Sequence, residues 1–117
     1  MPVYPSKGQP ITQLAPGVAR LAMLDGARGS ESITIAEVTI QPGAKTPVHY
    51  HPTEEAMVIL EGDLIAVLGG KRFPVTAGDV VVAPPTVTHG YINESDRPGR
   101  LYGIHPVNNP VTILVEG

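Results

Sequence analysis

The sequence predicts an all-β protein, either a sandwich or a barrel, and three observations support this prediction. Thirteen glycines and thirteen prolines among 117 residues recur between short runs rich in β-branched residues, as in strands joined by turns. No segment keeps a helical period of apolar residues over about ten positions. Instead, about nine short apolar runs follow one another at near-regular spacing, which is typical of sandwiches and barrels.

The chain is expected to form one domain preceded by an extended arm. Residues 1–16 contain prolines at positions 2, 5, 10 and 16, which forbid a helix and discourage a central strand. This arm packs either on its own chain or on a neighbouring subunit. Residues 17–117 form a single domain, because 117 residues are enough for one core and too few for two.

The first half of the domain is expected to begin with two strands. They cover Val18–Leu24 and Ser32–Gln41, and the second is rich in Ile, Val and Thr, which favour strands. Proline and glycine at positions 42–43 end this strand in a turn. A polar segment, His49–Glu55, then leads into a strand over Ala56–Glu61.

The second half continues the series of strands and turns. Gly62-Asp63 is a hairpin-like break before a strand over Leu64–Leu68, and Gly69-Gly70 suits the positive φ angles of a tight turn. The remaining strands are expected over 72–75, 79–83, 89–93, 101–105 and 111–115. Two runs, 57–60 and 80–83, are continuously apolar, so we expect both faces of these strands to be covered, by the facing sheet or by a partner subunit.

Composition and charge exclude several classes of function. A net charge of −3 and a pI near 5.7 leave no basic stripe, so nucleic acid and anionic membranes are not expected partners. The chain has no cysteine and therefore no disulfide, zinc–thiolate site or thiol nucleophile. Dinucleotide, P-loop and nucleophile-elbow motifs are absent. With no apolar leader and no stretch of ~20 apolar residues, a soluble cytoplasmic protein is expected.

Three histidines and one carboxylate supply the donors of a metal site. His49 and His51 point to the same face of a strand, Glu55 follows after a short turn, and His89 comes from another strand. Imidazole suits Fe, Ni, Cu and Zn, and a carboxylate extends the choice to Mn. Four protein donors leave two positions of an octahedral ion open, as in a catalytic site. The alternative is that these histidines are surface residues or satisfied core residues.

Two groups of residues in this region resemble the two conserved motifs of the cupin superfamily. The first motif is matched at every spacing by Gly43, His49, His51, Glu55 and Gly62. The second is matched by Gly78, Pro84, His89 and Asn93. Thr86 stands where the second motif usually has glycine, which alters the turn that aims His89. Fifteen residues separate Gly62 from Gly78, a separation typical of small microbial cupins.

The resemblance implies a small single-domain cupin of the conserved-barrel "cupin 2" type, with a double-stranded β-helix, or jelly-roll, fold. It implies one divalent transition metal ion (Fe, Mn, Ni, Cu or Zn) held by His49, His51, Glu55 and His89. Spacing favours Glu55 over Glu54, whose side chain should point to the opposite face. Small cupins are often homodimers, so a homodimer is expected as well.

The function expected from this site is a metal-dependent enzyme of dioxygenase type that acts on a small organic substrate. In this reading Glu55 leaves the ion transiently and acts as a base. One alternative is a non-enzymatic cupin that binds or senses a small ligand. Another is a non-redox metal-dependent isomerase or lyase. The fold alone does not decide among them, because cupins host many unrelated activities.

Further residues are candidates for the pocket or for catalysis. His105, the fourth histidine, is expected to be either a base or substrate contact near the metal or a structural residue. Arg97 and Arg100 either receive a substrate carboxylate or lie in a solvated loop. Strand parity and position suggest the following residues for the pocket wall, although each could equally fill the barrel: Met57, Ile59, Tyr91, Asn93 and Tyr102.

Overall fold

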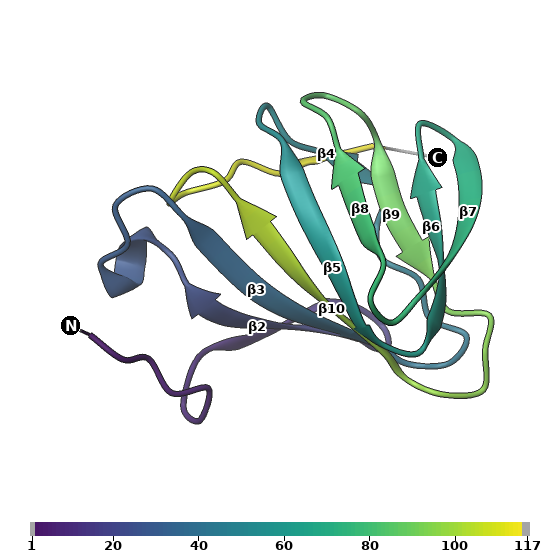
Figure 1. Cartoon of the computed structure of the whole chain (residues 1–117), viewed down its shortest axis with the longest axis horizontal. Coiled ribbons are helices and arrows are strands. Elements are labelled where there is room, and N and C mark those ends of the chain that lie inside the picture. Colours follow the sequence, from purple (N-terminus) through teal and green to yellow (C-terminus); the bar gives the residue numbers. More distant parts are fainter. Residues whose placement is uncertain (1, 116–117) are drawn as a thin grey trace.

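The computed structural model describes residues 2–115 and confirms the all-β class. Two antiparallel sheets face each other (Figure 1), with strand orders β1-β2-β3-β10-β5-β8 and β11-β4-β9-β6-β7. The first sheet consists of β1 (Ile11–Ala15), β2 (Val18–Leu24), β3 (Thr34–Ile40), β10 (Gly99–His105), β5 (Glu55–Glu61) and β8 (Val80–Ala83). The second consists of β11 (Ile113–Leu114), β4 (His49–Tyr50), β9 (His89–Ile92), β6 (Asp63–Leu68) and β7 (Lys71–Thr76), and a 3-10 helix, η1, covers Gly26–Arg28.

The N-terminal segment contains a strand that the sequence analysis did not expect. β1 pairs with β2 at the edge of the first sheet, and Pro10 and Pro16 flank it. An edge strand tolerates neighbouring prolines because its outer backbone groups need no partner strand. The preceding residues lie against the same chain, since the Arg28 Nε donates to Gln9 Oε1 at 2.8 Å and the Tyr4 hydroxyl donates to the Arg28 carbonyl.

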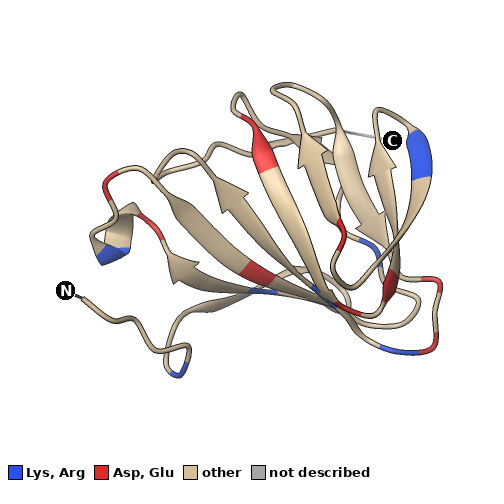
Figure 2. Ribbon diagram, in the orientation of Figure 1, with Lys and Arg blue, Asp and Glu red and all other residues tan. Residues whose placement is uncertain are grey.

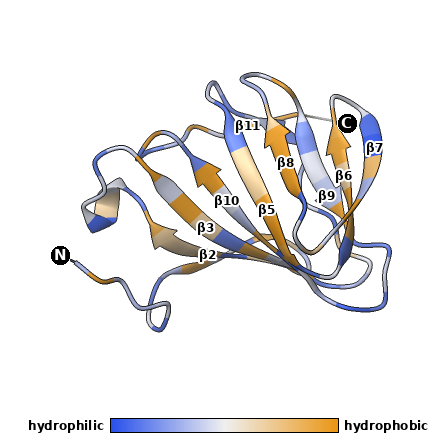
Figure 3. Cartoon of the chain, in the orientation of Figure 1, coloured by the Kyte–Doolittle hydropathy of each residue, from blue (hydrophilic) through white to orange (hydrophobic). Residues whose placement is uncertain are grey.

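The core lies between the sheets and follows from strand alternation. In β5 the residues at 55, 57 and 59 are buried and those between them are half-buried, so one face of the strand points inward. β10 alternates in the same way, from Leu101 in the apolar core to His105 near its end. Figure 3 shows the apolar residues along β5, β6 and β8, with hydrophilic residues where β5 and β9 begin. The first residues of these two strands, Glu55 and His89, are thus buried polar residues next to the apolar core.

β8 was expected to be covered on both faces, by the facing sheet or by a partner subunit, and within this chain only one of its faces is covered. Its inward residue Ala83 is 1% exposed, but Val80 and Val82 on the outer face are 60% and 44% exposed. The facing sheet covers one face of β8 only, because the fold has two layers and the other face of each sheet points outward. Cover of the outer side by a partner subunit stays a prediction.

Charged residues are distributed along the chain. Figure 2 shows Lys and Arg, and likewise Asp and Glu, scattered over loops and strands, including an acidic residue within β3. Within residues 2–115, no helix has the length and apolar character needed to span a membrane.

Candidate metal centre

The candidate site is built from strand ends that meet at one end of the barrel. His49 begins β4 and His89 begins β9, and the two residues are opposite each other in the β4–β9 pair. Glu55 is the first residue of β5, which starts at the same end (Figure 1). His51 follows β4 directly and is 5% exposed. Because these residues lie in paired strands or directly follow one, the hydrogen-bonded backbone fixes the positions of their Cα atoms.

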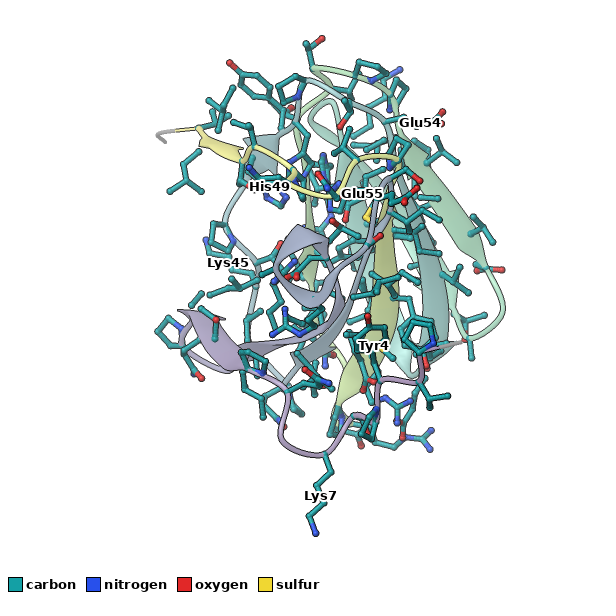
Figure 4. All side chains as sticks on the ribbon, turned by 90° about the vertical axis from the view of Figure 1, so that its left-hand side faces the viewer. Tyr4, Lys7, Lys45, His49, Glu54 and Glu55 are labelled. Carbon is teal, nitrogen blue, oxygen red and sulfur yellow. The ribbon has the colours of Figure 1, made fainter. Side chains whose placement is uncertain are left out.

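The donor atoms of His49, His51, Glu55 and His89 lie within 4.8 Å of one another, so one ion could contact all four. Glu55 Oε1 lies 2.9 Å from His89 Nε2 and 3.2 Å from His51 Nε2. In Figure 4 the side chains of His49 and Glu55 approach the same interior region from different strands. The structure thus brings together the four residues that the sequence suggested as ligands.

Backbone carbonyls orient all three imidazole rings. His49 Nδ1 donates to the Pro47 carbonyl at 2.8 Å, and His89 Nδ1 donates to the Val87 carbonyl at 3.0 Å. His51 Nδ1 donates to the carbonyl of Val111 at 2.8 Å. Because a carbonyl can only accept, each ring has a proton on Nδ1. Its Nε2 then has a lone pair available to a metal ion when the ring is neutral, and in His51 and His89 it is a donor to Glu55 when the ring is protonated.

This arrangement fits a divalent transition metal ion. Three Nε2 lone pairs and the Glu55 carboxylate face one another, and without a cation between them these electron-rich groups would repel. Either protons or a metal ion must balance them. Three imidazole nitrogens and one carboxylate oxygen are donors that Fe, Mn, Ni, Cu and Zn accept.

The electrostatics of the cluster are dominated by Glu55. Burial alone would raise the pKa of Glu55, but hydrogen bonds from His105, His51 and His89 hold it well below its usual range. Burial lowers the pKa of His51, yet the hydrogen bonds to Glu55 and to the Val111 carbonyl outweigh it and raise the pKa above 6.5. Burial also lowers the pKa of His49, and it outweighs the hydrogen bond to the Pro47 carbonyl, which acts in the opposite direction. Glu55 is therefore ionised, as a metal ligand must be.

Glu54 and Glu55 have opposite environments. Glu55 is 8% exposed and lies within the cluster, whereas Glu54 is exposed and its side chain points away from it (Figure 4). Adjacent residues at a strand start point to opposite faces, as the sequence analysis expected.

His105 contacts the second oxygen of the Glu55 carboxylate. Its Nε2 lies 3.2 Å from Glu55 Oε2, and its ring stacks edge-on with His51 at a centroid distance of 4.7 Å. The Nδ1 of His105 is buried and has no hydrogen-bond partner among residues 2–115. The structure places His105 beside the four candidate ligands, at a position from which it orients Glu55.

Sequence reasoning missed Gly103, which makes room for the carboxylate. A Cβ atom at this position would lie 2.6 Å from Glu55 Oε2, closer than real Cβ contacts allow. Gly103 lies two residues before His105 on the inward face of β10. A glycine inside an expected strand indicates a close approach, and that signal was present in the sequence.

A cavity of about 880 Å³ opens beside the cluster, and the four candidate ligands are part of its wall. Two of the suggested pocket residues, Met57 and Tyr91, line it, and the Tyr91 hydroxyl lies 3.1 Å from Met57 Sδ. Burial, together with the Glu55 charge, raises the pKa of Tyr91, which keeps its hydroxyl protonated. Met57 and Tyr91 thus add a thioether and a neutral phenol to the wall that contains the charged cluster.

The other three suggested pocket residues lie outside the lining. Ile59 is 1% exposed and is packed in the apolar core, farther along β5 than the cluster. Asn93 is fully buried, and its amide donates to the carbonyls of Ile40 and Arg97 at 2.9 and 2.8 Å, so it holds a turn. Tyr102 is on the opposite face of β10 from Leu101 and points out of the barrel.

The arginine in the cavity is not one that the sequence analysis suggested. Arg97 is exposed, and Arg100 pairs with Glu37 at 3.1 Å and Glu61 at 3.5 Å on the outer face of β10. Arg20 of β2 lines the cavity instead. Arg20 is two residues from the apolar Val18 and so shares its face of the strand, which could have indicated an inward position. The sequence alone did not show which face of β2 points inward.

The chain is similar to several proteins over part of its length. It is 31% identical over 74 residues to "Polyketide synthase CurC" from Streptomyces cyaneus, covering 62% of this chain and 48% of that protein. It is 32% identical over 60 residues to "Gentisate 1,2 dioxygenase 1" from Aquipseudomonas alcaligenes, covering 50% of this chain and 17% of the other. The chain thus spans at most about half the length of these relatives.

The fold and the family are shown by two further comparisons. The structure of the polyketide cyclase RemF from Streptomyces resistomycificus superposes with a TM-score of 0.84 at 21% identity, covering 100% of this chain and 87% of RemF. At this identity the likeness shows the fold alone. The sequence profile of the family described as "Cupin domain" matches residues 36–105, which include both motifs and all four candidate ligands. The chain therefore belongs to the cupin family, as its two motifs predicted.

Proposed function

We propose that this cupin is a metal-dependent enzyme that acts on a small organic substrate, with a dioxygenase-type reaction as the leading candidate. The observation that supports this proposal is the convergence of three Nε2 atoms and one carboxylate on the wall of a cavity of about 880 Å³. A site that served structure alone would be closed by its ligands, whereas this one borders a space that a substrate can enter.

In this proposal His49, His51 and His89 hold the ion through Nε2, and Glu55 holds it through Oε1. A bound divalent ion would polarise a substrate oxygen as a Lewis acid and, if redox-active, exchange electrons with dioxygen. The backbone carbonyls at Nδ1 keep the rings in the orientation that the ion requires. His105 holds the second carboxylate oxygen, so Glu55 keeps its direction when a substrate enters.

The remaining wall of the cavity positions the substrate. Met57, Tyr91 and Leu101 offer apolar surface to a hydrocarbon or aromatic body. Burial of that body excludes water from the reacting end and strengthens the electrostatic interactions there. The environment of Glu55 opposes uptake of a substrate proton, because three histidine contacts stabilise the ionised carboxylate. Glu55 is therefore a weak base in the resting site.

Two relatives support different reaction classes. The similarity to a gentisate dioxygenase supports oxidation by dioxygen, and the chain matches only a part of that protein. The similarity to a polyketide synthase component supports a second candidate, a non-redox reaction on a carbonyl-rich substrate. Zinc in the site would exclude the first class, because zinc does not exchange electrons, whereas iron, manganese or copper would be compatible with both.

Metal analysis of the purified protein tests the proposal, with the His49→Ala/His51→Ala variant as the control. About one equivalent of metal in the wild type and none in the variant is expected. If the protein contains iron, manganese, nickel or copper, the next experiment is oxygen uptake with catechols and diketones. If it contains zinc, the next experiment is an assay of non-redox turnover. Absence of metal even after reconstitution would overturn the proposal. Affinity for these compounds without turnover would favour a binding module.

A further inference from the structure

Arg20 occupies an unusual position for an arginine, in the middle of a strand on the face that points into the barrel. The residues two positions before and after it, Val18 and Ala22, are 0% and 7% exposed. In the sheet it pairs with Val38, whose side chain also borders the cavity. Arg20 itself is half-buried, so its guanidinium is partly withdrawn from water on a face whose neighbours are apolar, and an anionic partner would be favourable there.

No acidic side chain among residues 2–115 lies within ion-pair distance of Arg20. The three other arginines that form ion pairs do so at the surface or at η1: Arg28 with Asp25, Arg72 with Glu94, and Arg100 with Glu37 and Glu61. Two carboxylates border the cavity, and both are engaged elsewhere. Asp25 receives Arg28 at 2.7 and 2.8 Å, and Glu55 is held by the histidines.

Arg20 and the metal cluster face the same cavity. Both are part of its wall, Arg20 from β2 in the first sheet and the histidines and Glu55 from the strand ends at one end of the barrel. The same wall contains apolar side chains, among them Val38, Met57 and Leu101. The cavity therefore combines a cationic guanidinium, apolar surface and a donor cluster suited to a metal ion.

We propose that Arg20 is the substrate-anchoring residue of this cavity and that the substrate is a small organic carboxylate. Its carboxylate pairs with the Arg20 guanidinium, its apolar body lies against the wall, and a second oxygen faces the cluster of His49, His51, Glu55 and His89. A guanidinium binds a carboxylate through two parallel hydrogen bonds, which gives both energy and orientation. This inference rests on the proposed function for the role of the cluster, but the pairing with Arg20 does not require a metal.

The test measures binding of 4-hydroxybenzoate and of its methyl ester by titration calorimetry, in metal-free and in zinc-loaded protein. The hydroxyl and carboxylate of this probe are at opposite ends of the ring, so one end alone can reach the cluster. The wild type is expected to bind the acid about ten- to a hundredfold more tightly than the ester. Arg20→Gln should bind both equally, with the ester affinity unchanged, and Arg20→Lys should keep part of the preference.

The matched control is Arg97→Gln, which removes an exposed arginine and should keep the full preference. Unchanged ester binding in Arg20→Gln shows that the variant is folded. The same acid-to-ester ratio in wild type and Arg20→Gln would overturn the inference, as would absence of binding of the acid to the wild type. If the protein takes up no metal, the proposed function fails, while the preference in the metal-free protein still tests Arg20.

Discussion

Gly103→Ala separates the contribution of β10 to the metal site from its contribution to the core. The added Cβ would lie 2.6 Å from Glu55 Oε2, about 0.8 Å closer than an ordinary contact between carbon and oxygen. The carboxylate must turn away, and it then loses charge-assisted hydrogen bonds that are each worth about 1.5–3 kcal/mol. We expect metal affinity to fall by about ten- to a hundredfold, as when a partner of a metal ligand is removed.

Gly99→Ala is the matched control, since it places the same methyl group on the same face of β10. Its Cβ would lie 2.6 Å from Leu64 Cδ2, in the apolar core, and would touch no candidate ligand. Overpacking there is expected to lower the free energy of unfolding by about 1–3 kcal/mol and to leave metal affinity unchanged.

The assay is competition with a chromophoric chelator for zinc, combined with thermal unfolding of the metal-free proteins. Gly103→Ala should change the competition curve, and Gly99→Ala should change the unfolding curve. Wild-type zinc affinity in Gly103→Ala would refute the reasoning, because the carboxylate would then not depend on the space that Gly103 leaves. Equal loss of affinity in both variants would show that the effect comes through the fold and not through Glu55.

Three more predictions concern strain, protons and assembly. Thr86 has a φ of +66°, so Thr86→Gly should raise the free energy of unfolding by about 0.5–1 kcal/mol in urea titrations, and a decrease would show that the turn is unstrained. Burial lowers the pKa of His51, but hydrogen bonds to Glu55 and to a backbone carbonyl outweigh burial and raise the pKa, so a metal ion must displace a proton from this ring. Metal content should therefore fall as the pH is lowered through about 6. Full retention of metal after dialysis at pH 4 would contradict this. If the exposed Val80 and Val82 are covered by a second copy, replacing both with Lys should convert a dimer to a monomer in analytical ultracentrifugation; a monomeric wild type would refute the homodimer.

The fold class and the four candidate ligands were predictable because they depend on local patterns. Short β-branched runs between glycines and prolines indicate strands, and the spacing of His49, His51, Glu55 and His89 matches a known motif. Thr86 was identified as a departure from that motif, and the structure shows why glycine is usual there. The position requires a left-handed backbone, which a β-branched residue adopts only with strain.

The rest of the site depends on pairing between distant strands, which no local pattern shows. The contact between His105 and Glu55 arises because β10 lies beside β5, and their register sets the two side chains next to each other. Arg20 faces inward because β2 joins the sheet through β3. β1 was missed because the flanking prolines indicate an arm as readily as they indicate an edge strand.

The three candidate histidine ligands are held in place over very different lengths of chain. His49 and His89 are each oriented by a carbonyl two residues earlier, so the segments that lead into β4 and β9 suffice. His51 depends on the carbonyl of Val111, 60 residues farther on, in the segment that leads into β11. Completion of the donor set thus depends on docking of the last strand, because a chain cut before Val111 would keep the contact of His51 with Glu55 and lose the hydrogen bond to His51 Nδ1.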